Sequence, residues 1–176
     1  GSARRVEPVY GTADQPNFFR TAAGPGWALV GDAGLQQDQC TAIGMTHAFR
    51  DAELLSGAIS DGLSGALPMD QALADYVTRR DADSVEYHHF LADVAECNPP
   101  RLEQELGLFA AMRENPAQIS RFFSVFTDAL APSAFFAPES MQAVFSAART
   151  DLPEPEIFSC YNQRLEEALR NPWARA

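Results

Sequence analysis

The sequence predicts a mainly α-helical protein with five or six helices, preceded by one or two short N-terminal strands. Three observations predict this class. Apolar residues recur at three- and four-residue spacings from residue 41 onward. Glycine and proline divide that pattern into pieces of helix length. Turn-forming residues are concentrated instead in the first thirty or so positions, between short extended segments.

The amino-acid composition disfavours some classes of binding partner for this protein. Of the 176 residues, 46% are hydrophobic and 21% are charged, which is enough apolar sequence to build one globular core. The net charge of −11, from 13 basic and 24 acidic residues, disfavours nucleic acid and anionic membranes as partners. No apolar run reaches the roughly 18 residues that a membrane-spanning helix needs. The three cysteines are far apart in the sequence, which fits a reducing, cytoplasmic setting.

Two N-terminal segments are predicted to be extended, residues 5–10 and residues 27–30. The second segment is continuously apolar and ends at Gly31. A short apolar run without alternation is typical of a strand that is buried on both faces of a parallel sheet. Because such a strand needs neighbours, we expect another chain, or a part of the protein outside this sequence, to pair with it.

The first two helices follow from periodicity and from their end signals. The first begins near Thr41 and ends near Gly62 and Gly65, and its expected buried face consists of Ile43, Ala48, Ala52, Leu55 and Ile59. Pro68 is well placed to open the second helix. The apolar positions of this second helix are Leu73, Tyr76, Val77, Val85, Leu91 and Val94. The Asn-Pro-Pro sequence at residues 98–100 is expected to stop it.

The later helices are rich in phenylalanine. A third helix is marked by Leu102, Leu106 and Phe109, and a fourth opens at Pro116 with the stripe Ile119, Phe122, Phe123, Phe126 and Leu130. A short helix then carries Met141, Val144 and Phe145, and a last helix carries Ile157, Cys160, Tyr161, Leu165 and Leu169. We interpret the phenylalanines as a helical core, with a flat pocket for a planar substrate as the alternative. Phe135 and Phe136, on a proline-framed loop, are expected to make exposed apolar contacts.

The junction between the second extended segment and the first helix is the strongest candidate for chemistry. Asp32, between Gly31 and Ala33, would lie at the carboxyl end of a strand, where α/β folds bind ligands and where a carboxylate accepts hydrogen bonds from sugar-like hydroxyls. Residues 40–44 are expected to form the first helical turn, whose free N–H groups favour negative charge. The alternative is a plain connection in which Asp32 serves as a turn or cap residue.

The histidines are interpreted as structural. His47 within the first helix is expected to be a packing or surface residue rather than a base. His88 and His89 are adjacent, so on a helix they point in different directions and cannot share a metal ion. We expect a solvated helix face for both, and we assign no catalytic residue and no metal site.

Residues 27–59 resemble the second FAD-binding motif of the flavin-dependent monooxygenases related to para-hydroxybenzoate hydroxylase. The matching elements are Gly31-Asp32-Ala33, then Thr41-Ala42-Ile43-Gly44, and then the Ala-Phe-Arg-Asp-Ala-Glu-Leu-Leu run at residues 48–55. The order and spacing of these elements are more specific than a single glycine motif.

The resemblance implies cofactor-binding roles for seven residues and structural roles for two more. Asp32 resembles the aspartate that hydrogen-bonds the ribityl chain of FAD, with Gly31 and Ala33 beside it. Thr41, Ala42, Ile43 and Gly44 would direct backbone N–H groups at the pyrimidine edge of the flavin, where the reduced ring carries negative charge. Arg50 and Asp51 resemble helix residues of the family that we interpret as mainly structural.

Enzymes of this family open with a Rossmann unit whose G-x-G-x-x-G sequence holds the FAD pyrophosphate, and this sequence contains no such motif. The chain therefore resembles the C-terminal part, less than half, of such an enzyme, that is, the C-terminal fragment of an FAD/NAD(P)-binding α/β fold. We interpret residues 1–2 as a tag remnant, residues 3–66 as the C-terminal part of an FAD-binding domain, and residues 67–176 as a helical C-terminal region.

Two functional hypotheses follow. In the first, the complete protein is an FAD-dependent oxidoreductase that uses NAD(P)H and O2 to oxygenate a small organic molecule. The isolated chain is then expected to show no turnover and little affinity for FAD. In the second, the chain is a stand-alone acidic helical module that binds no flavin and forms a homodimer through residues 27–30 and the phenylalanine-rich helices.

Overall fold

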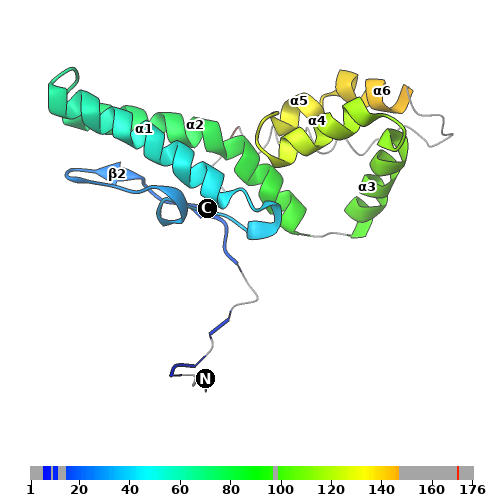
Figure 1. Ribbon diagram of the computed structural model, residues 1–176, viewed down its shortest axis with the longest axis horizontal. Helices are drawn as coiled ribbons and strands as arrows, with labels where there is room; N and C mark the ends of the chain where they lie inside the picture. The colour runs from blue at the N-terminus through cyan, green and yellow to red at the C-terminus, as the bar shows by residue number, and fades with distance from the viewer. Residues whose placement is uncertain (1–5, 9, 12–14, 97–98, 147–169, 171–176) are drawn as a thin grey trace, which may run out of the picture.

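The computed structural model describes residues 6–8, 10, 11, 15–96, 99–146 and 170, and it is mainly helical (Figure 1). The described residues form the helices α1 (Gly44–Ser64), α2 (Met69–Ala95), α3 (Pro99–Met112), α4 (Pro116–Phe126), α5 (Pro132–Phe135) and α6 (Pro138–Ser146). The predicted helical class is confirmed. The helix predicted around Ile157 to Leu169 lies outside the described residues. None of the described helices has the length and apolarity to cross a membrane.

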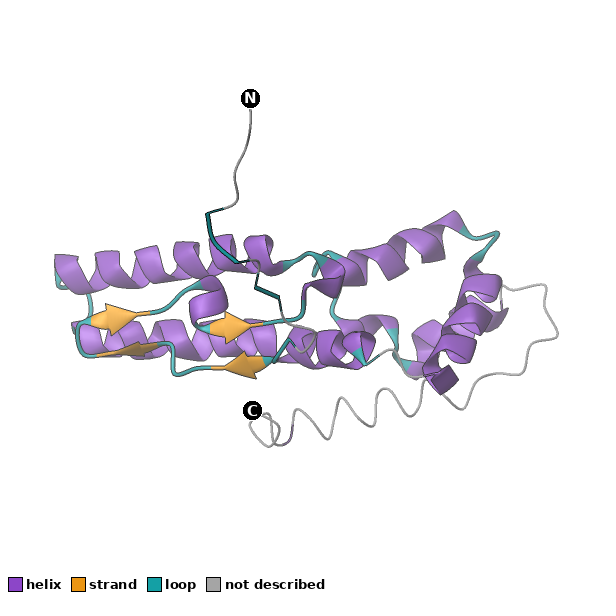
Figure 2. Cartoon of the chain, turned by 90° about the horizontal axis from the view of Figure 1, so that it is seen from below, coloured by secondary structure: helices purple, strands orange, loops and turns teal. Residues whose placement is uncertain are grey.

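The N-terminal strands are short and antiparallel. Strand β1 (Phe18–Phe19) pairs with β4 (Leu35–Gln36), and β2 (Ala23–Gly24) pairs with β3 (Trp27–Ala28). In Figure 2 these strands lie along the pair formed by α1 and α2. The described part of residues 5–10, namely 6–8 and 10, pairs with no strand, and the extended segment expected there stays a prediction.

The prediction of a doubly buried parallel strand at residues 27–30 is also wrong. Trp27 is 47% exposed and starts the second arm of a tight hairpin, in which Gly24 faces Trp27. A Cβ atom at Gly24 would lie 2.7 Å from the indole ring, and Gly26 has a φ of +80° at the turn. The hairpin therefore pairs this segment within its own chain, and no second chain is needed to satisfy it.

Helices α1 and α2 form an antiparallel hairpin with the predicted end signals. Gly65 takes a left-handed conformation (φ +77°) after the last residue of α1, and Pro68 precedes α2. A Cβ atom at Gly62 would lie 2.5 Å from the end of the Met69 side chain, so glycine allows the two helices to meet closely. The predicted boundary between residues 66 and 67 falls in this connection, and the two-region division stays a prediction.

The expected buried face of α1 is partly wrong. Ala52 and Ile59 are exposed, whereas His47 and Asp51 are buried on the side that faces the rest of the chain. The face was misassigned because periodicity alone places apolar residues inside, and here polar residues occupy the interior.

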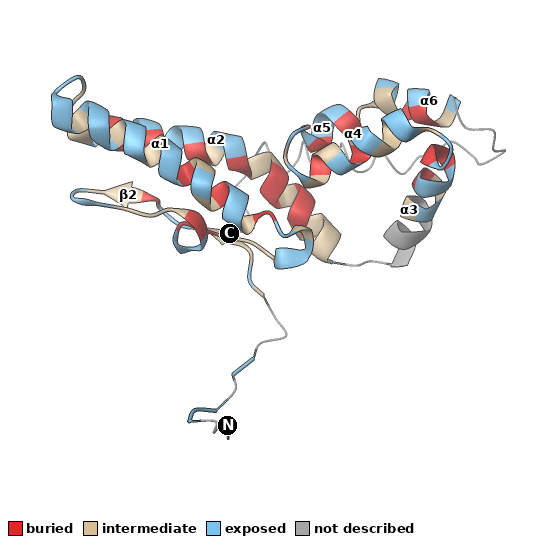
Figure 3. Ribbon diagram, viewed as in Figure 1, coloured by how far each residue is buried: buried red, intermediate tan, exposed pale blue. Residues whose placement is uncertain are grey.

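The apolar core lies at the other end of the molecule, between the second half of α2 and helices α3–α6 (Figure 3). Its buried residues are Ile43, Tyr87, Phe90, Leu91, Leu108, Ala111, Met112, Phe122, Val125, Phe135, Phe136, Met141 and Val144. The interpretation of the phenylalanines as a helical core is therefore confirmed. Asn115 accepts a hydrogen bond from the Gln118 N–H (3.3 Å) and caps α4, which begins at Pro116 as predicted.

One expectation about this core is wrong. Phe135 and Phe136 are buried rather than exposed, because residues 132–135 form a helix that covers the core. On α3, which Leu102, Leu106 and Phe109 were predicted to mark, the buried residues among those described are Leu108, Ala111 and Met112, whereas Leu106 and Phe109 are exposed.

Candidate functional site

The segment Gly31–Ala33 forms a single 3-10 turn, η1, packed against α1. Gly31 is buried with a φ of +56°, and a Cβ atom there would lie 2.9 Å from the Cβ of Ala48. Only glycine fits both the left-handed backbone and the close approach to the helix. The turn is thus seated directly on the first half of α1.

A buried carboxylate holds this turn in place. Asp51 of α1 is fully buried, and its Oδ2 accepts a hydrogen bond from the Gly31 backbone N–H at 3.4 Å. Its Oδ1 lies 3.6 Å from Nη2 of Arg50. A buried carboxylate needs such partners, because desolvation of an unpaired charge is costly. Asp51 therefore positions the Gly31 turn, in agreement with its structural interpretation.

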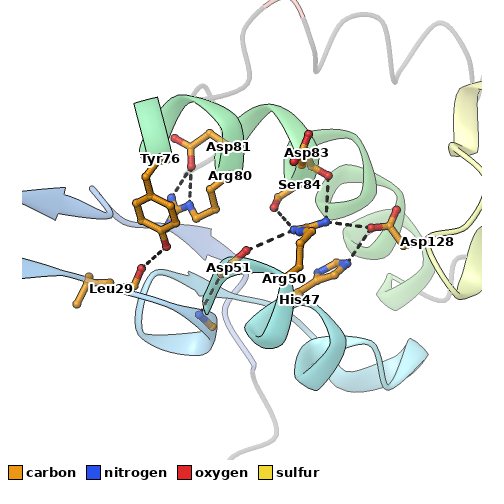
Figure 4. A network of polar contacts seen from close by, with 11 residues as sticks. Leu29, His47, Arg50, Asp51, Tyr76, Arg80, Asp81, Asp83, Ser84 and Asp128 are labelled. Carbon is orange, nitrogen blue, oxygen red and sulfur yellow. Dashed lines mark hydrogen bonds and ion pairs between the residues drawn. The ribbon is translucent and has the colours of Figure 1, made fainter. Parts of the chain in front are cut away.

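Arg50 joins this contact to the helices around it (Figure 4). Its guanidinium donates to the Ser84 hydroxyl at 2.6 Å and to Oδ2 of Asp128 at 3.1 Å. His47 Nε2 lies 3.1 Å from the same Asp128 oxygen, and the imidazole packs edge-on against Tyr87. His47 is therefore a packing residue as predicted, and it is buried.

Two side chains of α2 bond to the main chain of the N-terminal segment. The Tyr76 hydroxyl donates to the Leu29 carbonyl at 2.6 Å. Burial, reinforced by the negative charge of Asp51, raises the pKa of Tyr76 to about 12, so the phenol keeps its proton at neutral pH. Arg80, fully buried, bonds to Asp81 and to the Arg20 carbonyl at 3.2 Å.

Sequence reasoning missed Arg80. A Cβ atom at Gly34 would lie 2.5 Å from Arg80 Nη1, so the glycine after η1 makes room for the guanidinium. The local sequence pattern carried no signal for its burial, because the Arg20 carbonyl that it binds is distant in the sequence.

The structure brings the two predicted motif segments together. Asp32 and Ala33 are exposed on η1, and the Asp32 carboxylate lies next to the start of α1. A Cβ atom built at Gly44 would have Asp32 Oδ1 as its nearest neighbour, at 3.8 Å. The Asp32 carboxylate and the start of α1 therefore lie side by side in the described part of the chain.

The expected helical first turn at residues 40–44 is wrong. Residues Gln39–Thr41 form a separate 3-10 turn, η2, because Asp38 accepts a hydrogen bond from the Cys40 N–H at 2.9 Å and caps it. Ala42 then takes a left-handed conformation (φ 57°) and donates its N–H to the Gln39 carbonyl. Helix α1 begins only at Gly44.

The four residues whose N–H groups were predicted to face the flavin, Thr41 to Gly44, therefore have different surroundings. The Ala42 N–H is already bonded, and the Ile43 side chain belongs to the apolar core. Gly44 remains at the helix start, where the first N–H groups have no acceptor within the helix. Both polar atoms of the Gln37 amide are buried without a hydrogen-bond partner among the described residues.

His88 is buried, so the expected solvated face is wrong for this residue. Its ring packs edge-on against Phe19 with the centroids 4.7 Å apart. Burial, together with the neighbouring His89, lowers the pKa of His88 to about 4, and the imidazole is neutral at pH 7. Among the described residues, no three His, Cys, Asp or Glu side chains gather as a metal ion would require.

Comparison with known proteins identifies no relative of this chain. No family model matches the chain, and neither a curated protein nor a solved structure matches it. The functional interpretation rests on the arrangement of Asp32, Gly44 and the buried contacts behind them.

Proposed function

We propose that this chain forms the flavin end of an FAD site in an oxidoreductase of the aromatic hydroxylase type. The observation that carries the proposal is the approach of the Asp32 carboxylate to Gly44 at the start of α1. The resemblance of residues 27–59 to the second flavin motif of that family assigns the ligand. The same proposal places the enzyme in the reducing environment of the cytoplasm.

Asp32 supplies the contact to the ribityl chain. Its side chain is exposed on η1, so a carboxylate oxygen is available to accept hydrogen bonds from the sugar-like hydroxyls. Gly44 has no side chain, which leaves the space beside Oδ1 open to a ligand. Ala33, small and exposed, does not obstruct that approach.

The start of α1 supplies the electrostatic contribution. The N–H groups of Gly44, Met45 and Thr46 lie in the first turn, where the helix dipole favours negative charge. A reduced flavin carries such charge near N1 and O2. Bound FAD would take electrons from NAD(P)H and use O2 to oxygenate a small organic substrate. The protein contributes position and field, and no described side chain is assigned a catalytic role.

The sequence contains no G-x-G-x-x-G motif for the pyrophosphate. The proposal therefore predicts that this chain distinguishes poorly between FAD and FMN, because it contacts only the part that both share. It also predicts no turnover in isolation and an FAD dissociation constant weaker than about 1 μM.

Flavin fluorescence quenching tests the proposal with FMN, FAD and AMP as ligands. We expect FMN and FAD to bind with dissociation constants within about threefold of each other, and AMP not to compete. Asp32→Ala should weaken FMN binding at least about tenfold. Asp61→Asn, which removes an exposed charge at the far end of α1, serves as the matched control and should change nothing.

Two results would overturn the proposal. One is the failure of FMN to bind at concentrations up to about 5 mM. The other is equal affinity for FMN in Asp32→Ala and in the unaltered chain.

The stand-alone homodimer loses part of the surface first expected for it. Residues 27–30 lie largely within a hairpin of their own chain, and Phe135 and Phe136 are buried in the core. On the phenylalanine-rich helices, Phe109 and Phe123 remain exposed.

A further inference from the structure

The outward face of α1 carries an uncharged stripe that nothing in the described chain covers. Its members are Met45, Phe49, Ala52, Ser56, Ile59 and Leu63. The side chains of Met45, Phe49 and Leu63 are 77%, 77% and 78% exposed, and Ile59 is 39% exposed. We call these six residues the α1 stripe. Large apolar side chains in a continuous exposed row indicate an interaction surface.

The spacing of the α1 stripe indicates what kind of element covers it. Successive members are separated by four, three, four, three and four residues, which is the alternation of the two core positions of a heptad. A row at this 3.5-residue period keeps facing a second helix over several turns. The buried residues of α1, His47 and Asp51, lie on a different face from the stripe, and α1 contacts α2 and η1. A helix that covers the stripe therefore comes from outside the described chain.

The order of side-chain sizes identifies that partner helix. The stripe is symmetric about residue 54, with large residues at both ends and the small Ala52 and Ser56 at its centre. A two-fold interface requires a self-complementary surface. We propose that α1 pairs antiparallel with α1 of a second copy of this chain. Met45 then lies opposite the partner's Leu63, and Phe49 lies opposite the partner's Ile59.

Area and charge are consistent with a reversible dimer. From their exposure, the four large side chains present on the order of 500 Å² per copy, so pairing buries about 1,000 Å² in total, near the lower limit for a specific interface. Glu53 borders the stripe close to residue 54 and would approach the partner's Glu53 near the two-fold axis. Each copy also carries a net charge of −11. Repulsion between the copies weakens the dimer at low salt, and added salt screens it.

Sedimentation equilibrium from about 1 to about 100 μM protein tests the pairing. We expect a monomer–dimer equilibrium that tightens as NaCl rises from about 50 to about 500 mM. Phe49→Glu should raise the dimer dissociation constant at least about 100-fold, because it places a charge in the stripe. Glu53→Gln should lower it about two- to fivefold by removing the like-charge pair.

Phe123→Glu is the matched control. Phe123 is a 60% exposed phenylalanine on α4, away from the stripe, and its replacement should leave the dimer unchanged. Circular dichroism verifies that each variant keeps its helices. A monomer at about 100 μM overturns the proposal and assigns the stripe to a different occupant. Equal effects of Phe49→Glu and Phe123→Glu overturn it as well. Neither result depends on flavin binding.

Spin labels outside the stripe test the antiparallel orientation. On a background with its three cysteines replaced by serine, single cysteines are introduced by Thr46→Cys or Glu53→Cys. At 1.5 Å rise per residue, antiparallel pairing separates the two Thr46 positions by about 24 Å along the axis and the two Glu53 positions by about 3 Å. Equally short distances for both labels indicate parallel pairing and overturn the arrangement.

Discussion

The two halves of α2 are buried in different ways. Its first half, with the facing part of α1 and the N-terminal strands, encloses Asp51, Arg80 and Ser84, all completely buried. Its second half contributes Phe90 and Leu91 to a core whose other members are apolar or aromatic. The first region is held by directional contacts at defined atoms, and the second by burial of area.

The polar region shows what directional contacts accomplish. Three of its side chains bond to the main chain of the N-terminal segment. Arg80 donates to the Arg20 carbonyl, Tyr76 donates to the Leu29 carbonyl, and Asp51 accepts from the Gly31 N–H. These bonds fix the path of two-residue strands that are too short to be stable alone. The polar region therefore positions Asp32, and the aromatic region supplies stability.

The largest expected effect comes from the aromatic region. Phe90→Ala removes a buried ring that contacts Tyr87, Phe126 and Phe136, and it should lower the free energy of unfolding by about 3–5 kcal/mol in urea denaturation. FMN affinity of the folded protein should stay unchanged, because the variant loses buried apolar area and the residues of the flavin site keep their positions. A selective loss of FMN affinity would break the division between the two regions.

Arg80→Met is the corresponding change in the polar region. It leaves the Asp81 carboxylate and the Arg20 carbonyl without their donor, and we expect a loss of about 2–4 kcal/mol. Hydrogen exchange should accelerate first at amides 20–34. If the exchange increases uniformly over the described helices, the contact stabilises the whole chain and does not position the strands.

His88, buried on α2 against Phe19, links stability to pH. Because its pKa falls from 6.5 to about 4 on folding, the unfolded chain binds the proton first as the pH decreases. This contribution is complete above pH 6.5 and is lost between about pH 6.5 and pH 4, by up to about 3 kcal/mol. His88→Gln should flatten the pH profile of the urea midpoint over that window. An unchanged slope would contradict the burial of a neutral imidazole.

The smallest effect compares two hydroxyls. Tyr76→Phe removes the donor to the Leu29 carbonyl, and Tyr87→Phe removes the donor to the Phe126 carbonyl (3.0 Å) in the aromatic region. Each should cost about 1–2 kcal/mol. Only Tyr76→Phe should accelerate exchange of the Leu29 amide, which bonds to Ala22 across the hairpin. Equal acceleration of Leu29 exchange in both variants would contradict the distinction between the polar and the aromatic region.

The sequence predicted what depends on local chemistry. The end of α1 at Gly65, the start of α4 at Pro116 and the burial of Phe122 follow from backbone preference and period. The buried face of α1 could not be predicted in the same way, because hydrophobic periodicity identifies only apolar faces. Asp51 is buried on that helix because partners distant in the sequence stabilise it. The Trp27 hairpin was missed because two-residue strands are shorter than any periodic signal.

The candidate site was predictable in its residues and only partly in its form. Asp32 and Gly44 were selected together from the motif, and their proximity is a property of the folded chain. The left-handed Ala42 was not foreseen, because a non-glycine residue adopts that conformation only when the surrounding contacts hold it there.

Nuclear magnetic resonance titration with FMN tests the central claim most directly, that the polar region assembles a flavin-end site from two segments. The backbone amides of Asp32 and Gly44 should shift together along one saturable curve, while the amides of α4–α6 stay in place. If FMN shifts only the aromatic-core amides, or only one of the two segments, the site is not assembled as proposed.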